Sequence, residues 1–155
     1  MHHTLSRVQA MLGHRGVLTP AIGGGRWLVE RQVTVPWGDR VVLTRERGQP
    51  WPGRLPAPLP GTVFAPGRPT QVQDAAGAQI TIDERGALSG VPAVLVDSGR
   101  RHAVAAWAGP WPVSERGWDV ARTRRAYRFQ LVDAEQVAWL AVYEQGEWML
   151  EGRYD

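Results

Sequence analysis

The residue types that most often carry out catalysis lie scattered through this sequence. His14 and His102 have no partner at the spacing of a metal site, and the chain contains no cysteine. The serines lie in turn-like contexts without the motif of a nucleophile elbow. Because there is no lysine, a phosphate-binding loop that ends in lysine is impossible. The sequence therefore predicts no enzymatic activity, no cofactor and no metal site.

The densest charge cluster is the segment from Arg122 to Arg128, which holds four arginines and one tyrosine in seven residues. Exposed arginines beside an aromatic ring suit an acidic protein surface, and they equally suit the phosphates of single-stranded DNA whose bases stack on the ring. A third interpretation is a solvated face whose arginine stems cover apolar surface. The net charge of +3 is too small to choose between these interpretations.

The most distinctive segment runs from Ala106 to Trp118 and contains three tryptophans and two prolines. An indole can bury on the order of 200 Å², and proline favours extended backbone. We expect Trp107 and Trp111, together with Trp51, to anchor the core or a strap that crosses it. Tryptophan and arginine are also enriched among residues that dominate protein interfaces. We predict the following partner-binding residues: Arg122, Arg124, Arg125, Arg128, Trp118, Trp148 and Tyr154.

The first 61 residues predict a helix followed by extended chain. Thr4 to Leu12 has apolar residues on one helical face and Gly13 after its end. The segment from Gln49 to Pro60 has five prolines in twelve residues, which excludes a helix or a central strand. We interpret it as a Trp/Pro-rich strap that docks on its own domain, with a ligand for an aromatic groove of another protein as the alternative.

Residues 62–155 predict an antiparallel β domain, because short apolar or alternating runs recur between turn signals. The fold class is therefore mainly β: a small barrel or sandwich, possibly OB-like, with a short N-terminal helix. In the run from Ala126 to Val132 we expect Tyr127, Phe129 and Leu131 to face the core, and Arg128 and Gln130 to face water. The other expected strands are 62–64, 70–74, 79–82, 93–96, 102–107, 137–143 and 147–154.

The length of 155 residues is enough for one domain with a real core. No apolar run approaches the ~20 residues of a membrane span, and the beginning of the chain has no signal-peptide pattern. We therefore expect a cytoplasmic protein without membrane contact.

Two groups of motifs resemble a known family. One is Pro50-Trp51-Pro52-Gly53-Arg54-Leu55-Pro56-Ala57-Pro58 followed by Thr62-Val63. The other is the segment from Trp107 to Trp118, which leads to Arg125-Ala126-Tyr127-Arg128-Phe129-Gln130 and to the end of the chain from Glu147 to Asp155. Together they are similar to the C-terminal region of ImuB, the Y-family DNA-polymerase-like subunit of the bacterial mutasome, in its actinobacterial form.

The resemblance implies a function in damage-induced, mutagenic translesion synthesis. Proteins of this family are regarded as catalytically inactive hubs. Their expected partners are an error-prone DNA polymerase III alpha subunit, an ImuA-type RecA-like protein, and the sliding clamp through a motif upstream of this sequence. The resemblance also implies a cytoplasmic location, in association with the nucleoid during DNA damage. A single-stranded DNA-binding, OB-like module remains the alternative, and it rests on the arginine cluster.

Overall fold

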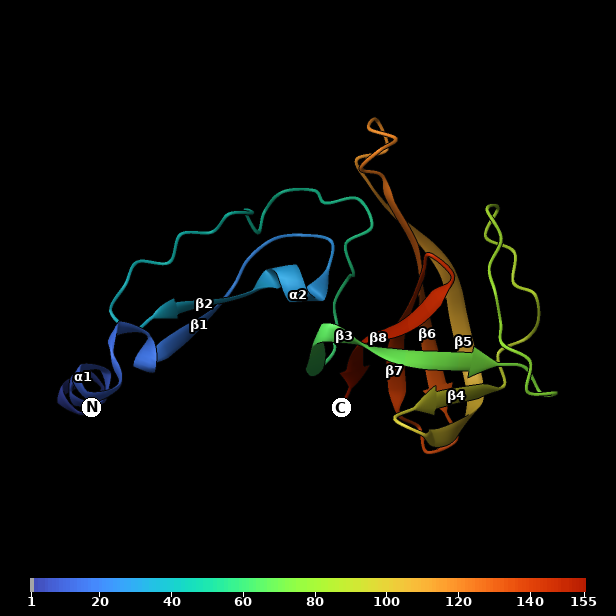
Figure 1. Cartoon of the computed structure of the whole chain (residues 1–155), viewed down its shortest axis with the longest axis horizontal. Helices are drawn as coiled ribbons and strands as arrows, with labels where there is room; N and C mark the ends of the chain where they lie inside the picture. Colours follow the sequence, from blue (N-terminus) through green and yellow to red (C-terminus); the bar gives the residue numbers. More distant parts are fainter. Residues whose placement is uncertain (1) are drawn as a thin grey trace. The chain divides into compact units, whose positions relative to one another are not determined.

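The computed structural model describes residues 2–155, and the chain divides into two compact units (Figure 1). We call Met1–Arg54 the N-terminal unit and Leu55–Asp155 the barrel unit. The division falls earlier than our predicted boundary between residues 61 and 62. The reason is that the end of the strap packs on the last strand: Pro60 lies so close to Gly152 that a Cβ there would come within 2.9 Å of it.

The N-terminal unit contains short elements around a two-stranded antiparallel sheet. The predicted helix is confirmed and begins two residues earlier than expected. Gly13 follows it with a φ of +87°, a conformation that favours glycine at the end of a helix. In chain order the elements are α1 (His2–Leu12), the 3-10 helix η1 (His14–Gly16), β1 (Leu18–Ile22), α2 (Leu28–Arg31) and β2 (Gln32–Pro36).

The predicted strap between Gln49 and Pro60 forms no helix or strand. Its indole, Trp51, is held inside the N-terminal unit, where Nε1 donates a hydrogen bond to the Glu46 carbonyl at 3.1 Å. The guanidinium carbons of Arg26 and Arg45 each lie 5.8 Å from the ring centre of Trp51. Cation–π contact therefore fixes this part of the strap.

The barrel unit is a closed, six-stranded antiparallel barrel. Each strand pairs with the next along the chain, and pairing of the first strand with the last closes it. The prediction of a mainly β chain with a short N-terminal helix is confirmed. The order differs from an OB-fold, which is a five-stranded Greek-key barrel. The strands are β3 (Thr62–Gln73), β4 (Val94–Asp97), β5 (Arg100–Glu115), β6 (Arg124–Asp133), β7 (Ala138–Glu144) and β8 (Glu147–Tyr154).

The core of the barrel is aliphatic and aromatic, and Phe129, Leu131 and Trp148 are all at most 1% exposed. The Phe129 and Trp148 rings lie 5.0 Å apart, and Trp148 Nε1 donates to the Ile80 carbonyl at 2.7 Å. Ile80 belongs to the expected strand 79–82, which forms only isolated bridges within the β3–β4 connection. The connection nevertheless closes one side of the core, because it receives the buried indole N–H.

Three hairpin turns of the barrel unit share one construction. In each, an aspartate side chain accepts from the backbone N–H groups two and four residues later. The residue three positions after the aspartate has a positive φ. These side-chain bonds replace ladder bonds that the turn interrupts. The aspartates are Asp74, Asp83 and Asp133, and the positive-φ residues are Gly77, Gly86 and Gln136.

Among the described residues, none of the helices is both long enough and apolar enough to cross a membrane.

Candidate functional site

The hairpin formed by β5 and β6 extends beyond the rest of the barrel (Figure 1). Residues 100–103 of β5 pair with β4, whereas further along β5 the strand that pairs with it is β6. Over the second half of β5, the edge opposite β6 therefore pairs with no described strand, although the turn at Gly86 lies close to Pro110. A register shift between Ala108 and Trp111 interrupts the β5–β6 pairing, and Gly109 lies there at φ +125°. A Cβ on Gly109 would come within 2.9 Å of the Phe129 ring, so glycine is required.

The register shift places the first two indoles on opposite faces of the hairpin. Trp107 lies opposite Leu131, and its ring centre is 6.5 Å from that of Phe129. Trp111 lies opposite Arg128, which points away from Phe129 because neighbouring residues of a strand alternate. Trp107 is 37% exposed and Trp111 is 44% exposed. We expected both indoles to anchor the core or a strap. Trp107 packs against the core residue Phe129 from a partly exposed position, whereas Trp111 does not face the core, because the extra residue of the bulge turns it to the other face.

The tip of the hairpin carries the most exposed indole of the chain's described part. Trp118 is 86% exposed and Val120 is 92% exposed. The turn is nevertheless ordered internally, because the Thr123 hydroxyl donates to the Asp119 carbonyl at 2.7 Å. The tip thus presents apolar side chains from a defined loop.

The predicted arginine cluster divides into two exposed members, of which Arg122 lies 3.9 Å from Asp119, and two members that form two-pronged ion pairs. Arg122 and Arg125 are exposed. Arg124 forms a two-pronged ion pair with Glu144, with distances of 2.6 and 2.8 Å. Arg128 is 2% exposed and forms a two-pronged pair with Glu151, with distances of 2.8 and 3.0 Å.

Three of the predicted partner-binding residues need comment because of their burial. Arg128 does not face water, so that expectation is wrong. Arg128 and Phe129 do lie on opposite faces of β6, as alternation predicts, but both side chains are buried. Trp148 is also wrongly predicted, because it is a core residue. Tyr154 is half-buried, and burial raises the pKa of its phenol. Trp118, Arg122 and Arg125 remain accessible, and Arg124 is partly so.

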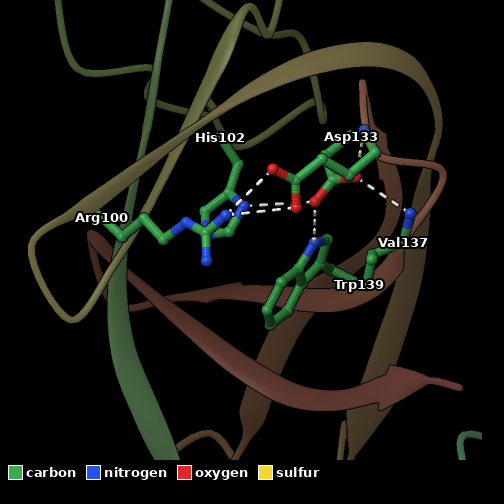
Figure 2. A network of polar contacts seen from close by, with 6 residues as sticks. Arg100, His102, Asp133, Val137 and Trp139 are labelled. Carbon is green, nitrogen blue, oxygen red and sulfur yellow. Dashed lines mark hydrogen bonds and ion pairs between the residues drawn. The ribbon is translucent and has the colours of Figure 1, made fainter.

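A polar network that we did not predict from the sequence lies around Asp133 (Figure 2). One carboxylate oxygen, Oδ1, accepts from the backbone N–H groups of Glu135 and Val137, both at 2.9 Å. The other oxygen, Oδ2, accepts from Trp139 Nε1 at 3.0 Å and lies 3.2 Å from His102 Nδ1. Burial raises the pKa of Asp133, but hydrogen bonds from Trp139, Val137 and Glu135, with the charge of His102, outweigh burial and lower it.

The geometry of this network fixes the His102 ring. Since an ionised carboxylate only accepts, the Nδ1 proton of His102 points to Asp133, and in the neutral ring Nε2 is the acceptor. The Trp139 ring lies 5.2 Å from the imidazole at an interplanar angle of 60°. Within residues 2–155, no serine or threonine hydroxyl forms a hydrogen bond to His102, so the pair lacks the nucleophile of a catalytic triad.

A pocket of about 300 Å³ adjoins this network. Its charges are balanced: Arg68 lies 3.3 Å from Asp97, and Arg100 pairs with Glu135 at 2.9 Å. The sequence held a signal for the network that we missed, namely the likeness of Asp133-Ala134-Glu135-Gln136-Val137 to the turns at Asp74 and Asp83. A further signal is Trp139, which follows the turn that begins at Asp133.

Comparison of the chain with protein-family models, curated proteins and solved structures found no match. The likeness to the ImuB family therefore rests on the motifs given above. The structure itself shows two candidate features. One is the β5–β6 hairpin with its exposed indoles, and the other is the network around Asp133, whose charged groups are paired or hydrogen-bonded.

Proposed function

We propose that the barrel unit is a non-catalytic module that docks protein partners through the β5–β6 hairpin. The observation that carries this proposal is the exposure of three indoles within twelve residues of one hairpin. We call this the hairpin surface and define it by Trp107, Trp111, Trp118, Arg122 and Arg125.

Exposed indoles are unfavourable in water and favourable in an interface. Covering a tryptophan that buries ~200 Å² contributes on the order of 5 kcal/mol before the costs of association. Tryptophan and arginine are both enriched among the residues that dominate interface energetics, and ordering a tryptophan costs little side-chain entropy because it has only two χ angles. The three indoles lie on both faces and at the tip of the hairpin, so a partner segment that wraps the hairpin reaches all of them.

The charges near the tip favour a partner segment that is both apolar and acidic. Arg116, Arg122 and Arg125 are exposed, whereas the nearby Asp119 is partly covered and lies 3.9 Å from Arg122. Pro110 and Pro112 remove N–H donors from β5, which disfavours addition of a partner strand along its edge. Contact through side chains is the mode that remains.

The resemblance to ImuB supplies the identity of the partners. We propose that they are the error-prone DNA polymerase III alpha subunit, the ImuA-type RecA-like protein, or both, within the translesion-synthesis mutasome. The hairpin surface fits this role better than single-stranded DNA binding, because carboxylates neutralise Arg124 and Arg128. The barrel unit as a whole also has ten arginines and twelve carboxylates.

The test is a binding titration of the purified chain with each of the two partner proteins by biolayer interferometry. We expect Trp118→Ala to weaken binding by about thirtyfold, the equivalent of about 2 kcal/mol. Trp111→Ala should act in the same direction. Leu12→Ala is the matched control, because Leu12 is an exposed apolar residue of the N-terminal unit.

Unchanged binding in both tryptophan variants would contradict the proposal. So would failure of the folded wild-type chain to bind either partner. A single-stranded oligonucleotide that loses affinity on combined Arg124→Ala and Arg125→Ala substitution would favour the DNA alternative for this surface.

A further inference from the structure

The pocket beside the Asp133 network is built by the strands of the barrel unit. Each of the six strands contributes at least one residue to its lining. Side chains that project from paired strands are held more firmly than those of loops, so such a pocket is largely preformed. Its volume of about 300 Å³ suits a small organic molecule. None of the residues that define the hairpin surface lines this pocket.

Arg68 of β3 brings unused hydrogen-bond donors to the pocket. Its guanidinium carbon lies 3.9 Å from the ring centre of Phe64, and its Nε lies 3.3 Å from Asp97 Oδ1. These two contacts hold the guanidinium group in place. The side chain is 36% exposed, and Nε is the one enclosed nitrogen of the group. The two Nη atoms are therefore accessible, and among the described residues they have no hydrogen-bond partner.

The two other arginines of the pocket are occupied. Arg100 Nη2 donates to both carboxylate oxygens of Glu135, at 2.9 and 3.2 Å. Arg153 donates through Nε and Nη2 to Asp155 Oδ1, at 3.1 and 3.0 Å. Arg68 differs from both, because its guanidinium group forms no hydrogen bond within the described part of the chain. Arg68 is therefore the arginine of this pocket that has donors to spare for a ligand.

His102 supplies the complementary group, a hydrogen-bond acceptor (Figure 2). Its side chain is 8% exposed, and its Nδ1 lies 3.2 Å from Asp133 Oδ2. Burial raises the pKa of Asp133, but its hydrogen bonds outweigh burial and lower it, so the carboxylate is ionised at neutral pH. The Nδ1 proton of His102 points to that carboxylate, which leaves the lone pair on Nε2. Nε2 has no hydrogen-bond partner among residues 2–155 and is not an enclosed atom, and the ring borders the pocket.

The charges of the pocket favour a ligand with a single negative charge. Three carboxylates, those of Asp97, Asp133 and Glu135, line it together with three arginines, so its fixed charges balance. A dianion such as phosphate meets those carboxylates with twice the repulsion, whereas a carboxylate fills one guanidinium fork with one charge. An uncharged hydroxyl that donates to an imidazole adds nothing to this balance. Val137 and Trp139 add apolar surface to the lining.

We propose that this pocket binds a small monocarboxylate that carries a hydroxyl group on the carbon next to the carboxylate. The carboxylate accepts from the Nη donors of Arg68, the hydroxyl donates to Nε2 of His102, and the apolar remainder contacts Val137 and Trp139. A molecule that fills a pocket of this size meets both polar groups. The site does not depend on the hairpin surface.

The test is an NMR titration of the whole 155-residue chain, labelled with nitrogen-15, with mandelate at pH 7. The Trp139 indole N–H donates to Asp133 beside the pocket, so its assigned resonance reports on occupancy. We expect a saturable shift with a Kd on the order of 1 mM, as is usual for a ligand of this size. Mandelamide lacks the charge and phenylacetate lacks the hydroxyl, and each should bind about tenfold more weakly.

Substitution of Arg68 tests the guanidinium fork. Arg68→Gln should weaken mandelate binding by about tenfold and remove the difference between mandelate and mandelamide. The matched control is Arg101→Gln, because Arg101 is exposed on β5, donates to Gln73 at 3.0 Å and does not line the pocket. It removes the same charge, and we expect a change in Kd of less than about twofold. An equal loss in both variants would mean diffuse charge attraction and would overturn the site.

Three further outcomes would overturn the proposal without any variant of Arg68. One is the absence of a saturable shift up to about 20 mM mandelate. Another is inorganic phosphate that shifts the same resonance at lower concentration than mandelate does. The third is N-acetylphenylalanine, a mimic of a protein C-terminus, that binds about tenfold more tightly than mandelate. Trp118→Ala should leave mandelate binding unchanged, so failure of this proposal is distinguishable from failure of docking through the hairpin surface.

Discussion

Arginine is the only basic residue besides histidine in both units, but the two units use it differently. In the barrel unit, Arg124 and Arg128 each form a two-pronged pair with a carboxylate from another strand. Among the described residues of the N-terminal unit, Arg31, Arg47 and Arg54 have no carboxylate partner. These arginines of the barrel unit thus tie strands together, whereas the three arginines of the N-terminal unit have no carboxylate to do the same among the described residues.

This contrast teaches that arginine density in the sequence is a poor guide to binding. The densest cluster, from Arg122 to Arg128, is half neutralised by β7 and β8. Arg31, Arg47 and Arg54, for which the described structure shows no carboxylate partner, are spread over twenty-four residues of the sequence. Counter-charges supplied by the fold, rather than spacing along the chain, decide which arginines are free.

The largest expected effect is the loss of the buried fastening in the barrel. Glu151→Ala leaves the buried Arg128 without its carboxylate, and we expect the free energy of unfolding to fall by about 3–5 kcal/mol. Chemical denaturation followed by tryptophan fluorescence measures this change. A loss below 1 kcal/mol would show that Arg128 is compensated by other groups, and the contrast between the units would weaken.

A smaller effect is expected at Asp133. Asp133→Asn weakens the acceptor of two backbone N–H groups, the Trp139 indole and His102, and should cost about 1–3 kcal/mol at pH 7. Because folding lowers the pKa of this carboxyl, its contribution is complete above the unfolded pKa of about 3.9 and is lost as the pH falls below that value. Denaturation curves at pH 7 and pH 3 should show the gap between wild type and variant narrowing at pH 3. A gap that is independent of pH would disprove the role of the charge.

In the N-terminal unit we expect a substitution of a buried arginine to increase stability rather than decrease it. Arg31→Met replaces a buried cation whose Nη1 has no hydrogen-bond partner in the described structure with an apolar side chain of similar length, so we expect local stability to rise by about 1 kcal/mol. Hydrogen exchange of the β1 and β2 amides reports on this unit separately from the barrel. Faster exchange in the variant would mean that the Arg31 guanidinium has a stabilising partner within the chain.

The smallest effect is expected for an exposed pair of the barrel. Arg100 and Glu135 are each 65% exposed in their side chains, so Glu135→Ala should change stability by less than about 0.5 kcal/mol. The same denaturation assay applies, with 0.5 M NaCl as a second condition. A loss of stability as large as that of Glu151→Ala would mean that the burial of an ion pair does not determine how much it contributes to stability.

Much of the fold was predictable from local patterns. The alternation of Tyr127, Phe129 and Leu131 correctly identified the core face of β6, and Gly13 correctly marked the end of α1. Closure of the barrel was not predictable, because pairing of β3 with β8 joins residues as far apart in the sequence as Thr62 and Arg153. Alternation also does not reveal whether the second face of a strand is covered, which is why Arg128 was misplaced.

The candidate site was less predictable from the sequence for two reasons. The faces on which its side chains lie depend on the register of the β5–β6 pairing, and the charges of its arginines depend on carboxylates from other strands. Gly109-Pro110 within a strand is a recognisable bulge signal, but its effect on Trp107 and Trp111 appears only with the register of β6. Trp148 occupies the core because the β3–β4 connection supplies a carbonyl for its N–H. No property of residue 148 itself indicates that acceptor.

The open edge of β5 has a consequence for behaviour at high concentration. An unpaired strand edge can form backbone hydrogen bonds with the same edge of another copy of the protein, which promotes aggregation into fibrils. Pro110 and Pro112 lie within it and withhold the donors that such growth requires. We therefore expect Pro110 and Pro112 to disfavour backbone pairing between copies of the protein along this edge.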